Sequence, residues 1–244
     1  VAFSPKFVPG LTLTIDRFEI KLSDIINTVG RQTKANQCYD TVERLFCEDL
    51  VRDTNPNVPG ANYVLTSVND QLINVASLRI KGIDFEARYG FPIANGQANV
   101  GIIGTIYDKA KQVALPGQPA IDLLGFAGGP TSDQGFVKFT ANSNIGWTGD
   151  NGFGFNYNIR YIGKTKNSPF ATAPVTIGDR FYHNARFSVR VEDRYQFFFG
   201  VDNIANSQPP LFPSSTSGTQ ALDTVPAYYD IFGRSFYAGF KVSY

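Results

Sequence analysis

The chain has 244 residues and a formal net charge of +1, and 14% of its residues are aromatic, with 21 Phe and 12 Tyr against one His. This near-neutral charge gives no electrostatic reason to expect nucleic-acid binding, and no stretch approaches the ~18 apolar residues that a membrane helix needs. A transmembrane β-barrel is compatible with this composition, because its strands alternate polar and apolar residues.

The first predicted strand begins at Leu11, where apolar residues alternate with Thr. The alternation changes phase at Asp16 and Arg17, which predicts either a β-bulge or the point where the strand leaves an apolar zone. Beyond that point the apolar side is carried by Phe18, Ile20 and Leu22.

A long polar segment, residues 23–74, follows this strand and is too long for a hairpin turn. We interpret it as a functional excursion, an external loop within the larger domain. Its two cysteines, Cys38 and Cys47, predict one local disulfide in an oxidising compartment that stiffens a short helix, with a pair of free thiols as the alternative. Two Cys without a neighbouring His or Cys cluster make a metal site a poor interpretation, and we expect no cofactor.

The remaining strand segments alternate in the same way, with Phe, Tyr, Val, Ile and Ala on one face and charged residues, Asn, Ser and Gly on the other. They are residues 80–91, 98–108, 136–147, 153–161, 181–191, 196–204 and 236–244. The connections between them are alternately short and long, and the long ones fall on the same side. That asymmetry, with strands of ~10 residues, predicts an all-β fold of about eight antiparallel strands that cross a membrane. A soluble sheet with its aromatic residues in a protein core is the alternative.

The chain ends on "FYAGFKVSY", which alternates up to its last residue. This ending resembles the C-terminal signal that the outer-membrane barrel-assembly machinery reads. The signal consists of a polar or aromatic residue, a Gly two positions later, and two apolar or aromatic residues at alternate positions at the end. The positions that match are Tyr237, Gly239, Val242 and Tyr244.

Several stretches, in order along the chain, resemble the C-terminal part of a TonB-dependent outer-membrane receptor. They are "SPKFVPGLTLTIDRFEIKLSDII", "QCYDTVERLFCEDLVRD", "IKGIDFEARY", "YIGK", "FFFGVDNIANSQPP" and "YDIFGRSFYAGFKVSY", and they cover Ser4 to Tyr244. The resemblance implies that residues 1–244 are the C-terminal portion of a 22-stranded barrel. The plug domain, its TonB-contacting segment and the earlier strands would then belong to another chain, a cleaved fragment or further sequence.

The function that the resemblance implies is uptake of a scarce nutrient, such as an iron-siderophore, cobalamin or a saccharide, driven through TonB by the inner-membrane proton gradient. It also implies a location in the cell outer membrane, in contact with lipid and lipopolysaccharide. The alternatives are a self-contained small barrel that acts as a passive porin or adhesin, and an outer-membrane enzyme. We expect no catalytic residues, because His183 has no Ser or Asp motif around it and is expected to face lipid or headgroups.

Two sets of residues are candidates for ligand contact. Charged residues on the polar face are expected to line the lumen, where they bind substrate, form cross-strand ladders or pair with the plug: Asp84, Glu86, Arg88, Lys138, Arg160, Arg186 and Arg190. Aromatic residues in the long loops are expected either to capture ligand or to pack the loops together: Tyr63, Phe126, Phe170, Phe212, Tyr228 and Tyr229.

Overall fold

The structure is a computed structural model, and it describes residues 1–53, 64–115, 117–128, 135–169, 174–192, 194–211 and 224–243. Its elements are mostly strands. They are, in chain order, β1 (Ala2–Phe3), β2 (Leu11–Asn27), α1 (Arg31–Tyr39), the 3₁₀ helix η1 (Cys47–Asp49), β3 (Leu50–Arg52), β4 (Leu65–Val68), β5 (Ile73–Pro92), β6 (Gly96–Val113), β7 (Ile121–Asp122), β8 (Phe139–Gly149), β9 (Phe153–Ile162), β10 (Thr165–Lys166), β11 (Thr176–Ile177), β12 (Arg180–Val191), β13 (Tyr195–Asp202) and β14 (Ser235–Val242).

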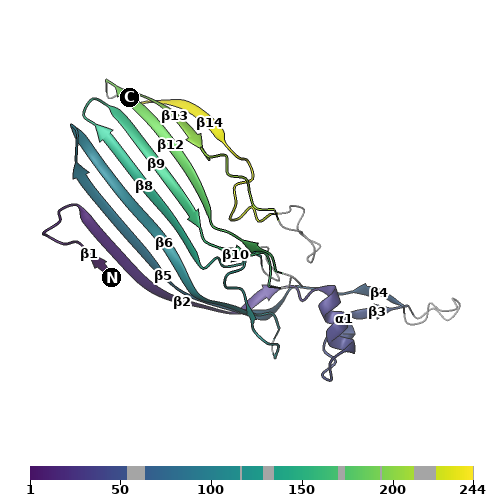
Figure 1. The fold of residues 1–244 in the computed structure, drawn as a ribbon. Coiled ribbons are helices and arrows are strands. Elements are labelled where there is room, and N and C mark those ends of the chain that lie inside the picture. Colours follow the sequence, from purple (N-terminus) through teal and green to yellow (C-terminus); the bar gives the residue numbers. More distant parts are fainter. Residues whose placement is uncertain are drawn as a thin grey trace. The chain divides into compact units, whose positions relative to one another are not determined.

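In the part of the chain that the structure describes, one main sheet holds ten strands. Its order is β1-β2-β5-β6-β8-β9-β12-β13-β14, with the short β7 paired to β6 (Figure 1). The pairs from β6 to β14 are antiparallel and in continuous register. The predicted all-β fold with an antiparallel sheet of long strands is therefore confirmed.

The connections differ in length at the two ends of the long strands. Residues 93–95, 150–152 and 192–194 make short turns at one end, whereas residues 114–138, 163–179 and 203–234 make long connections at the other (Figure 1). The first short turn has two consecutive residues in the left-handed region, Ala94 at φ 49° and Asn95 at φ 52°. Such a turn matches the twist of the strands that it joins. The asymmetry expected from the sequence is thus present in the structure.

Strand β2 continues through residues 23–27, which the sequence analysis had assigned to the excursion. Beyond the phase change at Asp16 and Arg17, Phe18 lies on the polar face of the sheet and not on the apolar side where the alternation had placed it. The ring of Phe18 lies over Gly82 and meets Tyr107 edge-on at 6.0 Å. On the opposite face, the ammonium of Lys81 forms an ion pair with Glu19 at 3.0 Å. Lys81 lies on the same face of β5 as the apolar residues that follow it in that strand.

The large apolar side chains of the sheet are exposed on one face, because no second layer of described residues packs on them. Ile145 is 44% exposed, Phe187 54% and Phe197 50%. The buried core lies instead among the long connections, and its members come from four segments of the chain. They are Ala127, Val137, Ile162, Ile177, Tyr182, Val225 and Tyr229.

The chain divides into two compact units: residues 1–20, 80–111 and 122–244 form the first, and residues 21–79 and 112–121 the second. In the second unit, Cys38 of α1 and Cys47 of η1 form a disulfide with their Cα atoms 4.9 Å apart, as predicted. Beside it, the ammonium of Lys34 is 2% exposed and lies 2.8 Å from an oxygen of Asp49 and 3.9 Å from one of Asp70. Among the described residues, no helix is both long and apolar enough to cross a bilayer.

Candidate functional site: the polar face of the sheet

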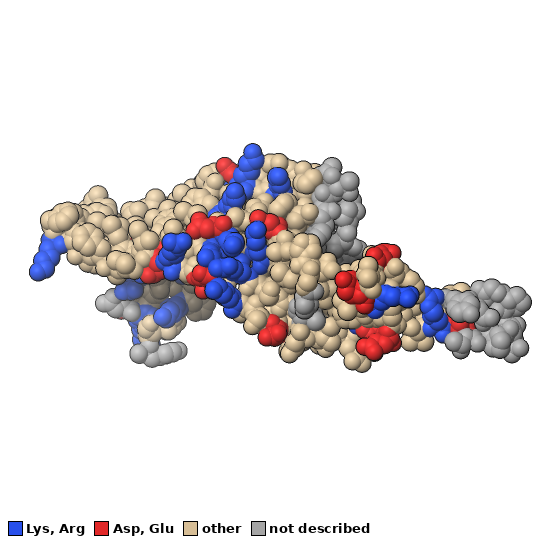
Figure 2. All heavy atoms as spheres, turned by 90° about the horizontal axis from the view of Figure 1, so that it is seen from below, with Lys and Arg blue, Asp and Glu red and all other residues tan. Residues whose placement is uncertain are grey.

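The side chains opposite the apolar face form a continuous polar surface across β5 to β14. Antiparallel register places direct partners on the same face. Asn142 lies beside Arg160, which lies beside Tyr182, and in the neighbouring row Asn144 lies beside Asn158. Figure 2, which views the molecule from below, shows Lys and Arg beside Asp and Glu near the middle of the view, so charges of both signs are mixed in that part of the surface.

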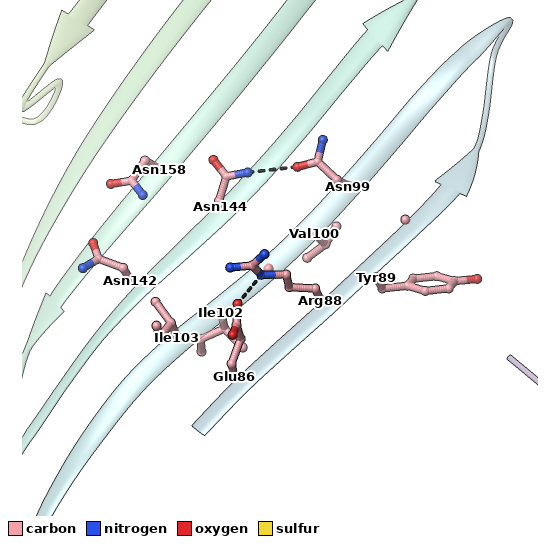
Figure 3. Close-up of a pocket in the computed structure, with 12 residues that line it drawn as sticks. Glu86, Arg88, Tyr89, Asn99, Val100, Ile102, Ile103, Asn142, Asn144 and Asn158 are labelled. Carbon is pink, nitrogen blue, oxygen red and sulfur yellow. Dashed lines mark hydrogen bonds and ion pairs between the residues drawn. The ribbon is translucent and has the colours of Figure 1, made fainter. Parts of the chain in front are cut away.

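The acidic and basic residues at the β5 end of this face are paired locally. Asp84 accepts a hydrogen bond from the hydroxyl of Thr105 at 2.6 Å, and the guanidinium of Arg88 forms an ion pair with Glu86 on the same strand (Figure 3). Glu86 and Arg88 border a hollow of about 530 Å³ that extends over β6, β8 and β9. Three of the predicted lumen residues are therefore neighbours on one strand, and two of them border this hollow.

Amide side chains cover the other side of the hollow and are hydrogen-bonded in series. Asn144 donates to the Oδ1 of Asn99 at 3.0 Å, as Figure 3 shows. Asn156, next to the hollow on β9, donates to the Oδ1 of Asn144 at 2.7 Å. Gly146 makes room for this series, because a Cβ there would lie 2.7 Å from the amide atoms of Asn99. These asparagines were not among the residues predicted to line the lumen, although their alternate positions in three neighbouring strands are a signal in the sequence that indicates a shared face.

The arginines farther along the face lie on aromatic rings. The guanidinium of Arg160 is 4.7 Å from the ring centre of Tyr182, and that of Arg186 is 4.2 Å from the ring centre of Phe198. Such cation–π contacts hold a charged group in place without a carboxylate partner. The predicted lumen residues Arg160 and Arg186 are thus positioned by aromatic residues that the sequence analysis had not assigned to the site.

The other two predicted lumen residues lie toward opposite ends of the sheet. Lys138 precedes β8, and its alkyl chain lies near Gly125 in a long connection. Arg190 pairs in register with Gln196 near the short turn between β12 and β13. The structure therefore spreads the seven charges along one face and does not bring them together at one point.

The described loop aromatics pack the long connections together. Tyr228 donates its hydroxyl hydrogen to the carbonyl oxygen of Gly135 at 2.5 Å, and the ammonium of Lys166 lies 6.0 Å from the ring centre of Phe126. Tyr229 is 2% exposed, and burial raises its pKa to about 12. Three other predicted loop residues and one residue of the assembly signal lie outside the described residues: Tyr63, Phe170, Phe212 and Tyr244.

The described residues of the predicted assembly signal make ordinary sheet contacts. Tyr237 pairs with Gly200, Gly239 with Phe198 and Val242 with Tyr195. His183 lies on the apolar face, where its Nδ1 is 2.9 Å from the hydroxyl of Tyr157. Within the described part of the chain, no group of three or more His, Cys, Asp or Glu side chains is placed to hold a metal ion.

Comparison with known proteins agrees with this architecture. A family model described as TonB dependent receptor-like, beta-barrel, matches residues 4–204. A mutant of the ferric enterobactin receptor of Pseudomonas aeruginosa is similar in fold, with a TM-score of 0.61, 14% identity and coverage of 100% of this chain and 30% of that one.

Two further solved structures are similar. The FrpB iron transporter of Neisseria meningitidis has a TM-score of 0.54 and 12% identity, covering 99% of this chain and 29% of its own. The siderophore receptor PirA of Acinetobacter baumannii has a TM-score of 0.59 and 14% identity, covering 100% and 30%. No curated protein sequence matches the chain. The chain spans about a third of the length of these structures, and the family match over most of its residues shows that it belongs to the TonB-dependent receptor β-barrel family.

Proposed function

We propose that this chain is the C-terminal part of the barrel of a TonB-dependent outer-membrane receptor that imports a scarce nutrient. The observation that carries the proposal is the family match over residues 4–204, on a sheet with one polar and one apolar face. In this arrangement the apolar face contacts lipid and the outer leaflet's lipopolysaccharide, and the polar face lines the lumen.

The exposed apolar face supports a location in the outer membrane. Phe187, Phe197 and Phe236 are each at least half exposed, which is costly in water but favourable against hydrocarbon tails. A spanning sheet must also pair its backbone groups within the protein. The strands at the two edges, β1 and β14, would therefore pair with further strands of a closed barrel, supplied by the rest of the receptor.

The polar face supports passage of a hydrated solute beside a plug. Its carboxylates and guanidinium groups are mixed, and its amides both donate and accept hydrogen bonds. Such a surface binds polar cargo weakly at many points, and it suits contact with a plug domain that moves when TonB pulls on it. The predicted lumen residues, including Arg88 and Arg160, contribute charge to this surface and none is proposed as catalytic.

The experiment is an uptake assay with the intact receptor in cells that lack the chromosomal copy. Radiolabelled ferric enterobactin, cobalamin and maltose are offered to cells with and without TonB. We expect one of these probes to accumulate in a receptor-dependent manner and to fall to background without TonB, because import against a gradient needs the energised inner membrane.

A receptor-dependent uptake that persists without TonB would contradict the proposal and indicate a passive porin. A strain with a receptor whose TonB-contacting segment is deleted is the matched control, since its barrel is unchanged. Its uptake should equal that of the strain without TonB.

A further inference from the structure

A second hollow lies at the end of the sheet from which the long connections leave. It has a volume of about 600 Å³ and is lined by the ends of β9, β12, β13 and β14 and by the segment before β14. That volume falls within the range of small-molecule sites, ~300–1,000 Å³. All of its lining residues belong to the first compact unit, and none belongs to the segments that the structure leaves undescribed.

The wall of this hollow is held by a hydrogen-bond network centred on Asn203, which is 1% exposed. Its amide nitrogen donates to the carbonyl of Ser207 at 3.0 Å and to Asp230 at 2.9 Å, and its Oδ1 accepts from the backbone N–H of Ser207 at 2.8 Å. Its own backbone N–H donates to the Oδ1 of Asn184 at 2.8 Å. The hollow is therefore preformed, which lowers the entropy cost of binding.

Two charged groups in this hollow have no ionic partner among the described residues. The guanidinium of Arg160 rests on the ring of Tyr182 and forms no ion pair with a described residue. The carboxylate of Asp202 likewise makes no hydrogen bond or ion pair within the described part of the chain. Asp202 is the register partner of Ser235, and the Nδ2 of Asn184 is still available to donate. A second carboxylate, that of Asp230, also lines the hollow, and its oxygens accept from the amide of Asn203 and the backbone N–H of Phe232. The hollow thus offers donors and acceptors, with one positive and two negative charges.

This combination selects against anionic ligands. A phosphate or carboxylate would pair with Arg160 but be repelled by Asp202 and Asp230. Neighbouring hydroxyl groups satisfy charged groups of both signs, because each hydroxyl accepts from a guanidinium or amide and donates to a carboxylate. Phe232, which is 90% exposed and lines the same hollow, offers an aromatic surface for the apolar side of a ring.

We infer that this hollow is a binding site for a compact, polyhydroxylated molecule that carries no negative charge and has the size of a mono- or disaccharide. The inference rests on the proposed function in one respect, that the ligand is cargo captured on the external side. Arg160 and Asn184 donate to its hydroxyl groups, Asp202 accepts from them, and Phe232 packs against the ring.

The test is binding by the intact receptor in detergent to an array of immobilised mono- and disaccharides, both neutral and acidic. We expect neutral sugars to bind and acidic ones not to bind. Arg160→Gln and Asp202→Asn should each weaken binding by about tenfold or more, the effect of ~1.4 kcal/mol. Retained heat-modifiability on a denaturing gel shows that each variant still forms its barrel.

A control variant makes the result specific to this hollow. Arg190→Gln removes a polar-face arginine at the other end of β12. It should bind as the wild type does. No binding of any neutral sugar, binding of acidic sugars alone, or equal binding by the Arg160 and Asp202 variants would overturn the inference. Because the assay needs no TonB, its failure is distinguishable from a failure of the proposed transport.

Discussion

The ring of Tyr237 on β14 lies over Gly200 of its partner strand β13, so that a Cβ at Gly200 would overlap the ring. Two residues along, the relation is reversed, and the ring of Phe198 on β13 lies over Gly239 on β14. Each strand therefore supplies one glycine and one aromatic ring to the pair. The arrangement fixes the register of β14, because a shift by one residue would move each ring off its glycine.

Gly200→Ala is expected to lower the free energy of unfolding by about 1–3 kcal/mol, the usual cost of overpacking. The methyl group would force the ring of Tyr237 out of its place over the strand. The effect is measured by unfolding the intact receptor in urea, with the folded fraction at each urea concentration read from its heat-modifiability on a gel. Gly178→Ala is the matched control, because a Cβ there meets no atom within 4 Å. The double variant Gly200→Ala/Tyr237→Ala should recover part of the loss; no recovery would show that the ring is not the cause.

Lys34→Met is expected to loosen the second compact unit. The ammonium of Lys34 is buried beside Asp49 and also donates to the carbonyl of Asn69 at 2.7 Å, so its removal leaves partly buried carboxylates uncompensated. Loss of one partner of a buried pair costs about 3 kcal/mol. Hydrogen exchange of the amides in residues 30–50 measures the loosening. Arg31→Met, an exposed change on the same helix, should leave exchange unchanged, and equal exchange in both variants would contradict the prediction.

Loss of the disulfide should have a separate effect on the same unit. The bond closes a loop with a sequence separation of 9 residues, and its removal in Cys38→Ser/Cys47→Ser should cost ~2–3 kcal/mol through the entropy of the unfolded chain. Limited proteolysis of intact cells should cleave this variant faster than the wild type within residues 28–72. Wild-type protein treated with a reductant should be cleaved at the same faster rate, and an unchanged rate in both would show that the bond stabilises nothing.

Tyr229 should make stability fall at high pH. Burial raises its pKa to about 12 from the ordinary tyrosine value of 10.0, so the folded state keeps the proton over a range in which the unfolded state loses it. The stability from the neutral hydroxyl is complete below pH 10 and is lost as the pH rises toward 12. In Tyr229→Phe this part of the pH dependence should disappear, as measured by urea unfolding at pH 8 to 12.

The same variant should not be destabilised at neutral pH. The hydroxyl of Tyr229 is buried without a hydrogen-bond partner among the described residues, so its removal relieves a desolvation cost of about 1 kcal/mol or more. Tyr39→Phe, at a position that is 52% exposed, is the control and should change neither quantity. A loss of stability in Tyr229→Phe at pH 7 would mean that the hydroxyl has a partner.

Arg186 and Phe187 are adjacent in β12 and lie on opposite faces, which allows a direct test of the membrane placement. A spin label on Phe187→Cys should collide with oxygen, which concentrates in lipid, more often than a label on Arg186→Cys does. The label on Arg186→Cys should collide with a water-soluble nickel complex more often than the label on Phe187→Cys does. Cys38 and Cys47 do not react with the label, because they are joined in a disulfide. Equal accessibility of the two labels in liposomes would contradict the proposed lipid-facing role of the apolar face.

The long strands and their two faces were predictable from the sequence, because alternation has a period of two and every residue from Phe153 to Tyr161 obeys it. The disulfide was predictable for a similar reason, since Cys38 and Cys47 are close in the chain. The position of Phe18 was not, because an aromatic residue on the polar face depends on a glycine in the next strand.

The contacts among the long connections were also beyond the reach of the pattern. Tyr228 reaches Gly135, 93 positions away in the sequence, and Tyr229 joins a core built from four segments. Local periodicity in the sequence cannot predict contacts between segments so far apart in the chain. Likewise, Lys34 looks like an ordinary solvated lysine until η1 and the segment after β4 supply its partners. The second hollow also depends on contacts between distant segments. Of the seven predicted charges only Arg160 lines it, so the set as a whole did not indicate where it would lie.

The series of asparagines from Asn156 through Asn144 to Asn99 has a consequence for anything that moves along it. An amide can exchange one neutral partner for another with little change in free energy, whereas a charge must be resolvated each time that it lets go. A polar molecule that slides across these strands would therefore meet a nearly level energy surface. Under the proposed function, a polar solute would therefore bind more weakly to the amides in the middle of the sheet than to the charged and aromatic groups near its ends.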